Sequence, residues 1–89
     1  MGEGEGHYFS PTAFGRRVKE LRKEKNMTQK ELSDRLDMDD GSLRRIEAGR
    51  TNPTLQTINK ISNAFDTPVW MLFAPNQHTN EVPVAAKIK

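Results

Sequence analysis

The sequence predicts a compact all-α domain of five helices. Apolar residues recur at spacings of three and four through most of residues 11–74, which is the period of a helix with one buried face. Residues that favour helix N-caps stand at the start of several of these segments. We therefore expect a flexible arm rich in glycine and glutamate at 1–10, one helical domain at 11–74, and a C-terminal tail at 75–89. The tail has an apolar group around Pro83 that a short strand would also fit.

The first helix is expected to begin at Pro11 or Thr12, since proline is favoured at the first helical position. Its buried face is formed by three apolar residues at helical spacing, Phe14, Val18 and Leu21. The expected outward face carries five charged residues, Arg16, Arg17, Lys19, Glu20 and Lys23. Asn26 is expected to interrupt this helix.

Thr28 and Glu31 predict the start of the second helix. A threonine followed three residues later by a glutamate has the spacing of a capping box, in which each side chain bonds the other residue's backbone N–H. Leu32 and Leu36 are expected to face inward, and the helix is expected to end near Asp37.

Asp39 is the predicted N-cap of a third helix, which runs from about 40 to 48. Leu43 and Ile46 lie three residues apart and are expected on its buried face. Gly49 is the expected C-terminal stop, because glycine readily adopts the left-handed conformation that ends helices.

A turn at 52–53 precedes a fourth helix, which Thr54 is expected to cap. Its apolar residues are Leu55, Ile58, Ile61, Ala64 and Phe65. Residues 66–68 break the pattern. Residues 69–73 are expected to form a last short apolar helix, closed by Pro75.

Composition excludes several classes of function. The chain has no cysteine, and His7 and His78 are far apart, so we expect no disulfide and no metal site. A nucleophile–base pair and a glycine-rich phosphate loop are also missing from the sequence, so we expect no enzyme and no cofactor. The net charge is only +2, but most of the basic residues lie between Arg16 and Arg50.

The sequence also argues against a membrane protein. No apolar run approaches the roughly 18 residues that span a bilayer. The first residues, MGEGEGHYFS, are acidic where a secretory signal would be basic and then apolar. We therefore expect a soluble, cytoplasmic protein with no membrane partner.

Two short helices joined by only a few residues must cross sharply. This geometry presents the second helix of the pair to the major groove of DNA, which is wide enough to admit it. The run TQKELSDRLDMDDGSLRRIEAGRTNPTL is similar to the Xre/Cro-like helix-turn-helix family of phage repressors and bacterial regulators. The similarity extends from about Phe14 to Phe73 and implies a lambda-repressor-like fold that binds double-stranded DNA.

The resemblance implies a set of DNA-contacting residues: Thr28, Gln29, Asp40, Gly41, Ser42, Arg44, Arg45, Arg50, Thr51 and Asn52. Gln29 begins the second helix, where it suits a phosphate, although it would also serve as a capping amide in solvent. Arg44 and Arg45 are the main candidates for base contact, since arginine pairs bidentately with guanine, and one of them would alternatively bind phosphate. Residues 50–52 are expected to contact the sugar-phosphate backbone. Arg22 and Glu47 match a structural salt bridge of the family.

Three positions depart from the family pattern. Ser33 replaces an alanine, and we expect no effect. Asp37 replaces a glycine where φ is often positive, which aspartate tolerates better than most residues. Asp39 and Asp40 replace polar residues before Gly41. Asp39 is expected only to cap the helix, whereas Asp40 either reads cytosine or weakens DNA binding.

A second set of residues is expected at a homodimer interface: Val69, Trp70, Met71 and Phe73. Residues 69–73 are more apolar than one face of a short helix can bury, and helix-turn-helix modules usually bind two half-sites as dimers. Alternatively, the tail covers them. The resemblance leaves two kinds of function open: a transcriptional regulator, and an antitoxin or restriction-modification controller whose tail binds a partner protein.

Overall fold

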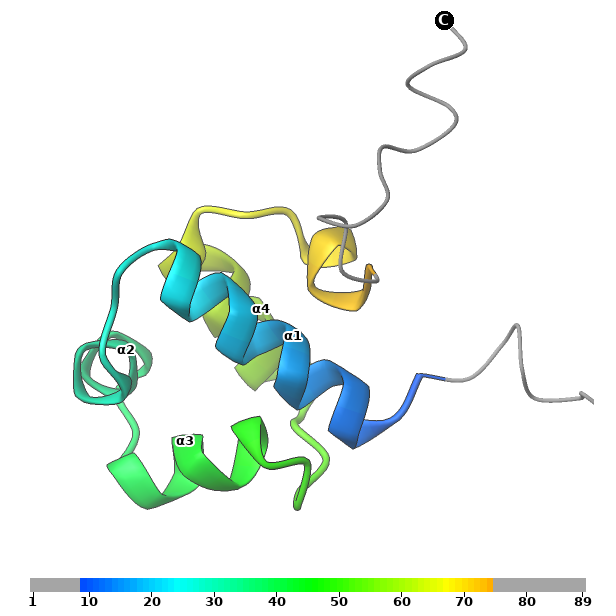
Figure 1. Ribbon diagram of the computed structural model, residues 1–89, viewed down its shortest axis with the longest axis horizontal. Coiled ribbons are helices and arrows are strands. Elements are labelled where there is room, and N and C mark those ends of the chain that lie inside the picture. Colours follow the sequence, from blue (N-terminus) through cyan, green and yellow to red (C-terminus); the bar gives the residue numbers. More distant parts are fainter. Residues whose placement is uncertain (1–8, 75–89) are drawn as a thin grey trace, which may run out of the picture.

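The computed structural model describes residues 9–74 as a compact arrangement of helices (Figure 1). Four α-helices are followed by a short 3₁₀ helix: α1 (Pro11–Glu24), α2 (Gln29–Leu36), α3 (Asp40–Glu47), α4 (Leu55–Phe65) and η1 (Val69–Phe73). Between residues 9 and 74 there is no strand, as expected for an all-α fold. The predicted tail and most of the predicted arm lie outside the described residues.

The prediction of five helices is wrong for the last one, which is not an α-helix. Residues 69–73 form a 3₁₀ helix that starts after Pro68 and has no side-chain cap. Five residues can close only about one α-helical turn, and short segments of this kind commonly adopt the tighter 3₁₀ geometry.

Side-chain caps fix where the four α-helices begin. Thr28, Asp39 and Thr54 each accept a hydrogen bond from the backbone N–H three residues later, as predicted. The capping box of Thr28 and Glu31 is present. Ser10 caps α1 in the same way, which places Pro11 at the first helical position and decides between the two predicted starts.

Residues with a positive φ, in the left-handed backbone conformation, lie where two of the helices, α2 and α3, end. Asp37 ends α2 with φ 57°, so the prediction of a positive φ at this aspartate is confirmed. Gly49 has φ 77° and follows α3, whose C-cap is Ala48. Both residues redirect the chain at the end of a helix, and α2 packs against α3 and α4.

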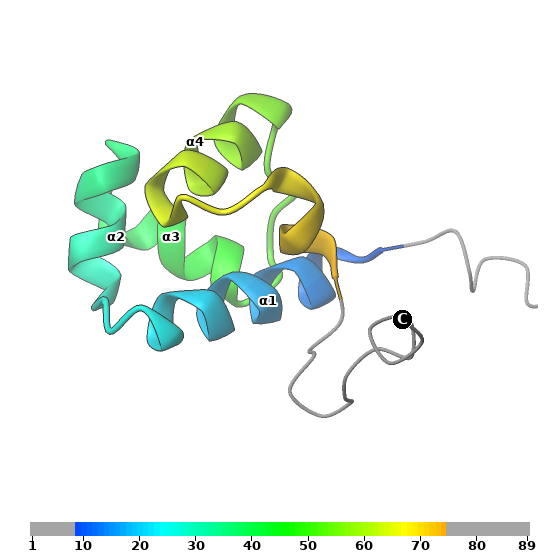
Figure 2. The same cartoon turned by 90° about the horizontal axis from the view of Figure 1, so that it is seen from above.

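The helices enclose one apolar core. Its buried members are Phe14, Val18, Leu21, Leu32, Leu36, Leu43, Ile46, Ile58, Ile61, Phe65 and Leu72. α1 packs against α3 and η1, and α2 packs against α3 and α4. Figure 2 shows η1 between α1 and α4, where Leu72 enters the core.

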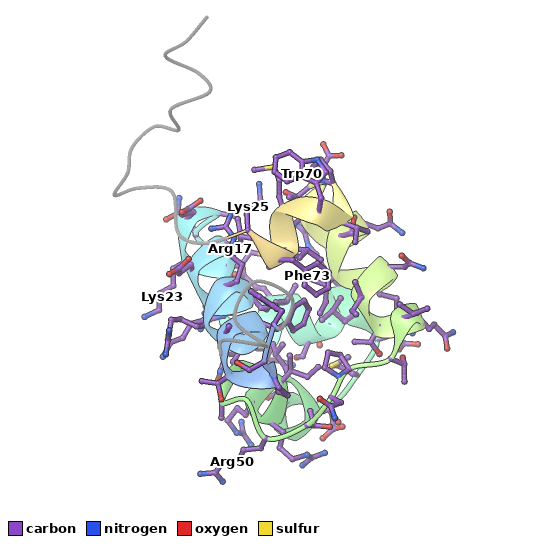
Figure 3. The ribbon with its side chains drawn as sticks, turned by 90° about the vertical axis from the view of Figure 1, so that its right-hand side faces the viewer. Arg17, Lys23, Lys25, Arg50, Trp70 and Phe73 are labelled. Carbon is purple, nitrogen blue, oxygen red and sulfur yellow. The ribbon has the colours of Figure 1, made fainter. Side chains whose placement is uncertain are left out.

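One residue of α1 lies on a face other than the one expected, and one apolar residue of α4 is exposed. Arg17 was expected to face outward but is buried (Figure 3). Its Nε donates a hydrogen bond to the carbonyl oxygen of Met71 at 2.9 Å, and its Nη1 donates one to Glu20 at 3.3 Å. These bonds satisfy a guanidinium that burial would otherwise destabilise. Leu55, an apolar residue at the first position of α4, is 78% exposed.

Gly15 allows α1 to touch α3. A Cβ atom at this residue would collide with the carbonyl oxygen of Ile46 and would lie 2.7 Å from that of Glu47. The two helix backbones therefore approach more closely than any side chain at position 15 would permit.

Candidate nucleic-acid interface

Helices α2 and α3 form a helix-turn-helix. They are joined by residues 37–39, and α3 lies along the lower edge of the molecule in Figure 1. Leu43 and Ile46 bury one side of α3 against α1 and α2. Arg44 and Arg45 are exposed on its other side.

A hollow of about 450 Å³ opens beside the exposed side of α3. It is lined by Lys19, Gln29, Gly41, Arg44, Arg45, Glu47, Ala48 and Arg50. Four of these are cations, contributed by α1, by α3 and by the segment that follows it. Lys19 was not predicted as a site residue, because its place depends on how α1 packs against α3 and no local pattern shows this.

The only carboxylate in that lining belongs to Glu47, and it is held by donors within the protein. Arg22 Nε lies 2.7 Å from Glu47 Oε2, and Arg22 Nη2 lies 3.1 Å from Oε1. Both side chains are at least 90% buried, so the structure contains the expected salt bridge in a bidentate form. Arg22 Nη1 also donates to the carbonyl oxygen of Met27.

Gln29 donates from Nε2 to Glu47 Oε1 at 3.0 Å. Its amide therefore does not merely cap the helix in solvent, which was one of the two alternatives for this residue, and the phosphate contact stays a prediction. The bond links the N-terminus of α2 to α3 and orients a carboxamide in the lining of the hollow. The sequence does not indicate this contact, because the two residues are 18 positions apart.

Asp39 is the N-cap of α3 and also begins a chain of polar contacts. It accepts hydrogen bonds from the backbone N–H and the hydroxyl of Ser42, and Arg45 donates to that hydroxyl at 3.3 Å. The hydroxyl of Ser42, with smaller contributions from backbone N–H groups and the charge of Arg45, lowers the pKa of the Asp39 carboxyl. This cap therefore remains ionised at neutral pH, and Ser42 links it to Arg45.

Asp40, the first residue of α3, contacts α2. Its Oδ1 accepts a hydrogen bond from the hydroxyl of Ser33 at 2.6 Å. The two departures from the family pattern, which were considered separately in the sequence, are thus partners in the structure.

The segment after α3 remains close to it. The backbone N–H of Arg50 donates to the carbonyl oxygen of Arg45, and the Arg50 side chain projects from the molecule (Figure 3). Asn52 is exposed and Thr51 is half-buried. Thr28 is exposed at the start of α2, with its hydroxyl occupied by the capping box.

A family model described as "Helix-turn-helix" (HTH_3) matches residues 18–69. The chain belongs to this family. Its members share the fold of DNA-binding transcriptional regulators, and the family is the one that the sequence motif indicated. A search of curated protein sequences found no match.

Solved structures of other helix-turn-helix proteins are similar. The restriction-modification controller protein C.AhdI from Aeromonas hydrophila is 32% identical, with a TM-score of 0.69, over 71% of this chain and 96% of that one. SinR, the master regulator for biofilm formation, is 34% identical in a complex with DNA, with a TM-score of 0.64, over 68% of this chain and 98% of that one. The N-terminal DNA-binding domain of SinR from Bacillus subtilis is 29% identical, with a TM-score of 0.63, over 75% of this chain and 96% of that one.

The described part of this helix-turn-helix protein has no cluster of metal ligands and no membrane-spanning helix. Among residues 9–74, His, Cys, Asp and Glu side chains do not gather in groups of three or more that would hold a metal ion. In the same range, no helix has the length and apolar character needed to cross a membrane.

Proposed function

We propose that this protein is a sequence-specific, DNA-binding transcriptional regulator that acts as a homodimer, with α3 in the major groove. The observation that carries the proposal is the charge of the hollow beside α3. Lys19, Arg44, Arg45 and Arg50 line it, while its carboxylate, Glu47, is paired with Arg22. Such a surface attracts the phosphates of DNA and presents two exposed arginines, Arg44 and Arg45, to base edges.

The residues divide between two tasks in this proposal. Arg44 and Arg45 read guanine through its O6 and N7 atoms, and the contacts of Arg45 with Ser42 restrict its position before DNA arrives. Gln29, together with Thr28 and residues 50–52, contacts the backbone and sets the register. Lys19 adds a phosphate contact from α1.

A salt series tests the function itself. The protein should shift a fragment of its own promoter in a gel, and the logarithm of its affinity should fall linearly with the logarithm of salt concentration. Equal affinity for random DNA, or affinity without salt dependence, would rule the proposal out.

Substitution of each arginine distinguishes base reading from phosphate contact. Arg44→Ala and Arg45→Ala should each weaken operator binding by about 1–3 kcal/mol and relax the preference at one base pair. The measurement is fluorescence anisotropy with operators changed one base pair at a time. Lys60→Ala removes an exposed cation from α4, outside the lining of the hollow, and serves as the charge-matched control. Uniform weakening on every sequence would assign the arginine to phosphate.

The dimer is proposed to form around η1. Trp70 is 67% exposed, and Val69 lies beside it at 38%. Phe73 is less available for contact with a partner, because its ring packs on two others within the protein. Its centroid lies 5.3 Å from that of Phe9 and 5.2 Å from that of Phe14. In Figure 3, Trp70 and Arg50 lie at opposite ends of the molecule, so a partner at η1 would not cover the segment that follows α3.

Trp70→Glu should convert the dimer into a monomer, since it places a charge at the centre of the proposed apolar contact. Sedimentation velocity measures the change, and binding to a two-half-site operator should weaken with it. Leu55→Glu provides the matched control, because Leu55 is a similarly exposed apolar residue elsewhere. A wild-type protein that sediments as a monomer at micromolar concentration would contradict the proposal.

A second candidate function is control of a restriction-modification system. It is favoured by the 32% identity to C.AhdI over 96% of that protein. Mapping the protein's genomic binding sites would test it, since a controller should bind upstream of a methyltransferase or endonuclease gene. The antitoxin alternative depends on a partner for residues 75–89, which lie outside the described residues.

A further inference from the structure

The hydroxyl of Ser33 connects α2 to the N-terminus of α3. Ser33 Oγ lies 2.6 Å from Asp40 Oδ1 and 3.0 Å from the carbonyl oxygen of Lys30. A hydroxyl has one proton, and a carboxylate is a stronger acceptor than a peptide carbonyl, so the proton is donated to Asp40. Ser33 is fully buried, so water does not compete for this donor.

This bond decides where the Asp40 carboxylate points. Asp40 is the first residue of α3, at the end where a recognition helix meets base edges. Gly41 follows it without a side chain, and the neighbouring carboxylate of Asp39 is occupied by Ser42. Both carboxylates at the N-terminus of α3 therefore accept hydrogen bonds from groups within the protein.

We propose that Ser33 is a specificity-determining positioning residue, which holds the Asp40 carboxylate against α2 and so leaves base reading to Arg44 and Arg45. The inference rests on the proposed function, since it concerns DNA at α3. Without the hydroxyl, the carboxylate is free to turn toward the groove. There it repels phosphates and the acceptors O6 and N7 of guanine, and the N4 amino group of cytosine becomes a favourable partner.

Four proteins test this proposal: wild type, Ser33→Ala, Asp40→Asn and the double variant. Each is used to select preferred sites from a random DNA library, and its affinity for the wild-type operator is measured. Ser33→Ala should bind that operator about tenfold more weakly, as for one mismatched base pair, and should gain a preference for cytosine at one position. Asp40→Asn removes the charge, so adding Ser33→Ala to that variant should change its affinity by less than about twofold.

Ser62→Ala is the matched control. Ser62 lies on α4, and its hydroxyl donates a hydrogen bond to the carbonyl oxygen of Thr67 at 2.6 Å. The variant therefore loses a similar hydrogen bond away from α3. It should melt at a lower temperature and keep the wild-type base preference. The proposal is overturned if Ser33→Ala selects the wild-type sites with wild-type affinity, or if its loss of affinity persists in the double variant. If wild type shows no preference over random DNA, the proposed function fails first, and this inference fails with it.

Discussion

Glu47→Ala is expected to lower the free energy of unfolding by about 3–5 kcal/mol, because it leaves the buried guanidinium of Arg22 without its charged partner. Arg22 would retain one hydrogen bond, to the carbonyl oxygen of Met27. A small domain has about 5–15 kcal/mol of stability in total, so the loss is a large fraction of it and should clearly lower the midpoint of unfolding. Urea denaturation followed by circular dichroism measures it.

An exposed ion pair gives the control for this experiment. Lys30 and Asp34 lie 3.6 Å apart on α2 with side chains 73% and 65% exposed. Lys30→Ala should change stability by less than about 1 kcal/mol, as is usual for solvated pairs. Equal losses for Glu47→Ala and Lys30→Ala would show that Arg22–Glu47 is not an energetically important buried pair.

Glu47 also connects the stability of the domain with its proposed activity. The same carboxylate that neutralises Arg22 accepts a hydrogen bond from Gln29, which also lines the basic hollow. A carboxylate left unpaired at this place would repel phosphate. Its pairing therefore serves the fold and the electrostatics of the surface together.

Features set by neighbours in sequence were predictable. The capping box of Thr28 and Glu31 and the cap at Asp39 each depend on residues within three positions, whereas the positive φ of Asp37 was expected from the glycine that the family has there. Arg22 and Glu47 are far apart in sequence, and their pairing was expected only because the motif resembles a known family. The buried faces of α2 and α3 were predictable because two apolar residues in each follow helical spacing.

Features set by packing between helices were not predictable. Arg17 was expected to face solvent, since the spacing on α1 does not reveal that η1 brings the Met71 carbonyl over it. The hydrogen bond from Ser33 to Asp40 was not expected, because the two residues lie on different helices. Lys19 joins the hollow through the contact of α1 with α3. In each case the partner comes from another element, and a single helical period carries no information about it.

That contact between α1 and α3 can itself be tested at Gly15. Gly15→Ala should destabilise the protein by roughly 3 kcal/mol, because the added methyl meets backbone carbonyl oxygens that cannot rotate away. The gain in helix propensity, about 1 kcal/mol, offsets only part of this cost. Relief requires α3 to move outward, which would displace Arg44 and Arg45 and open the hollow.

The signature of this displacement is a loss of operator affinity in Gly15→Ala at temperatures where circular dichroism shows a folded protein. Gly41→Ala is the matched substitution, since its added methyl would meet only side-chain ends, the nearest being Asp39 Oδ2 at 3.2 Å. It should alter stability by less than about 1 kcal/mol, the size of the propensity difference. If Gly15→Ala were as stable as wild type, the two helices would have room to separate. The close approach of α1 to α3 would then not be what positions the recognition helix.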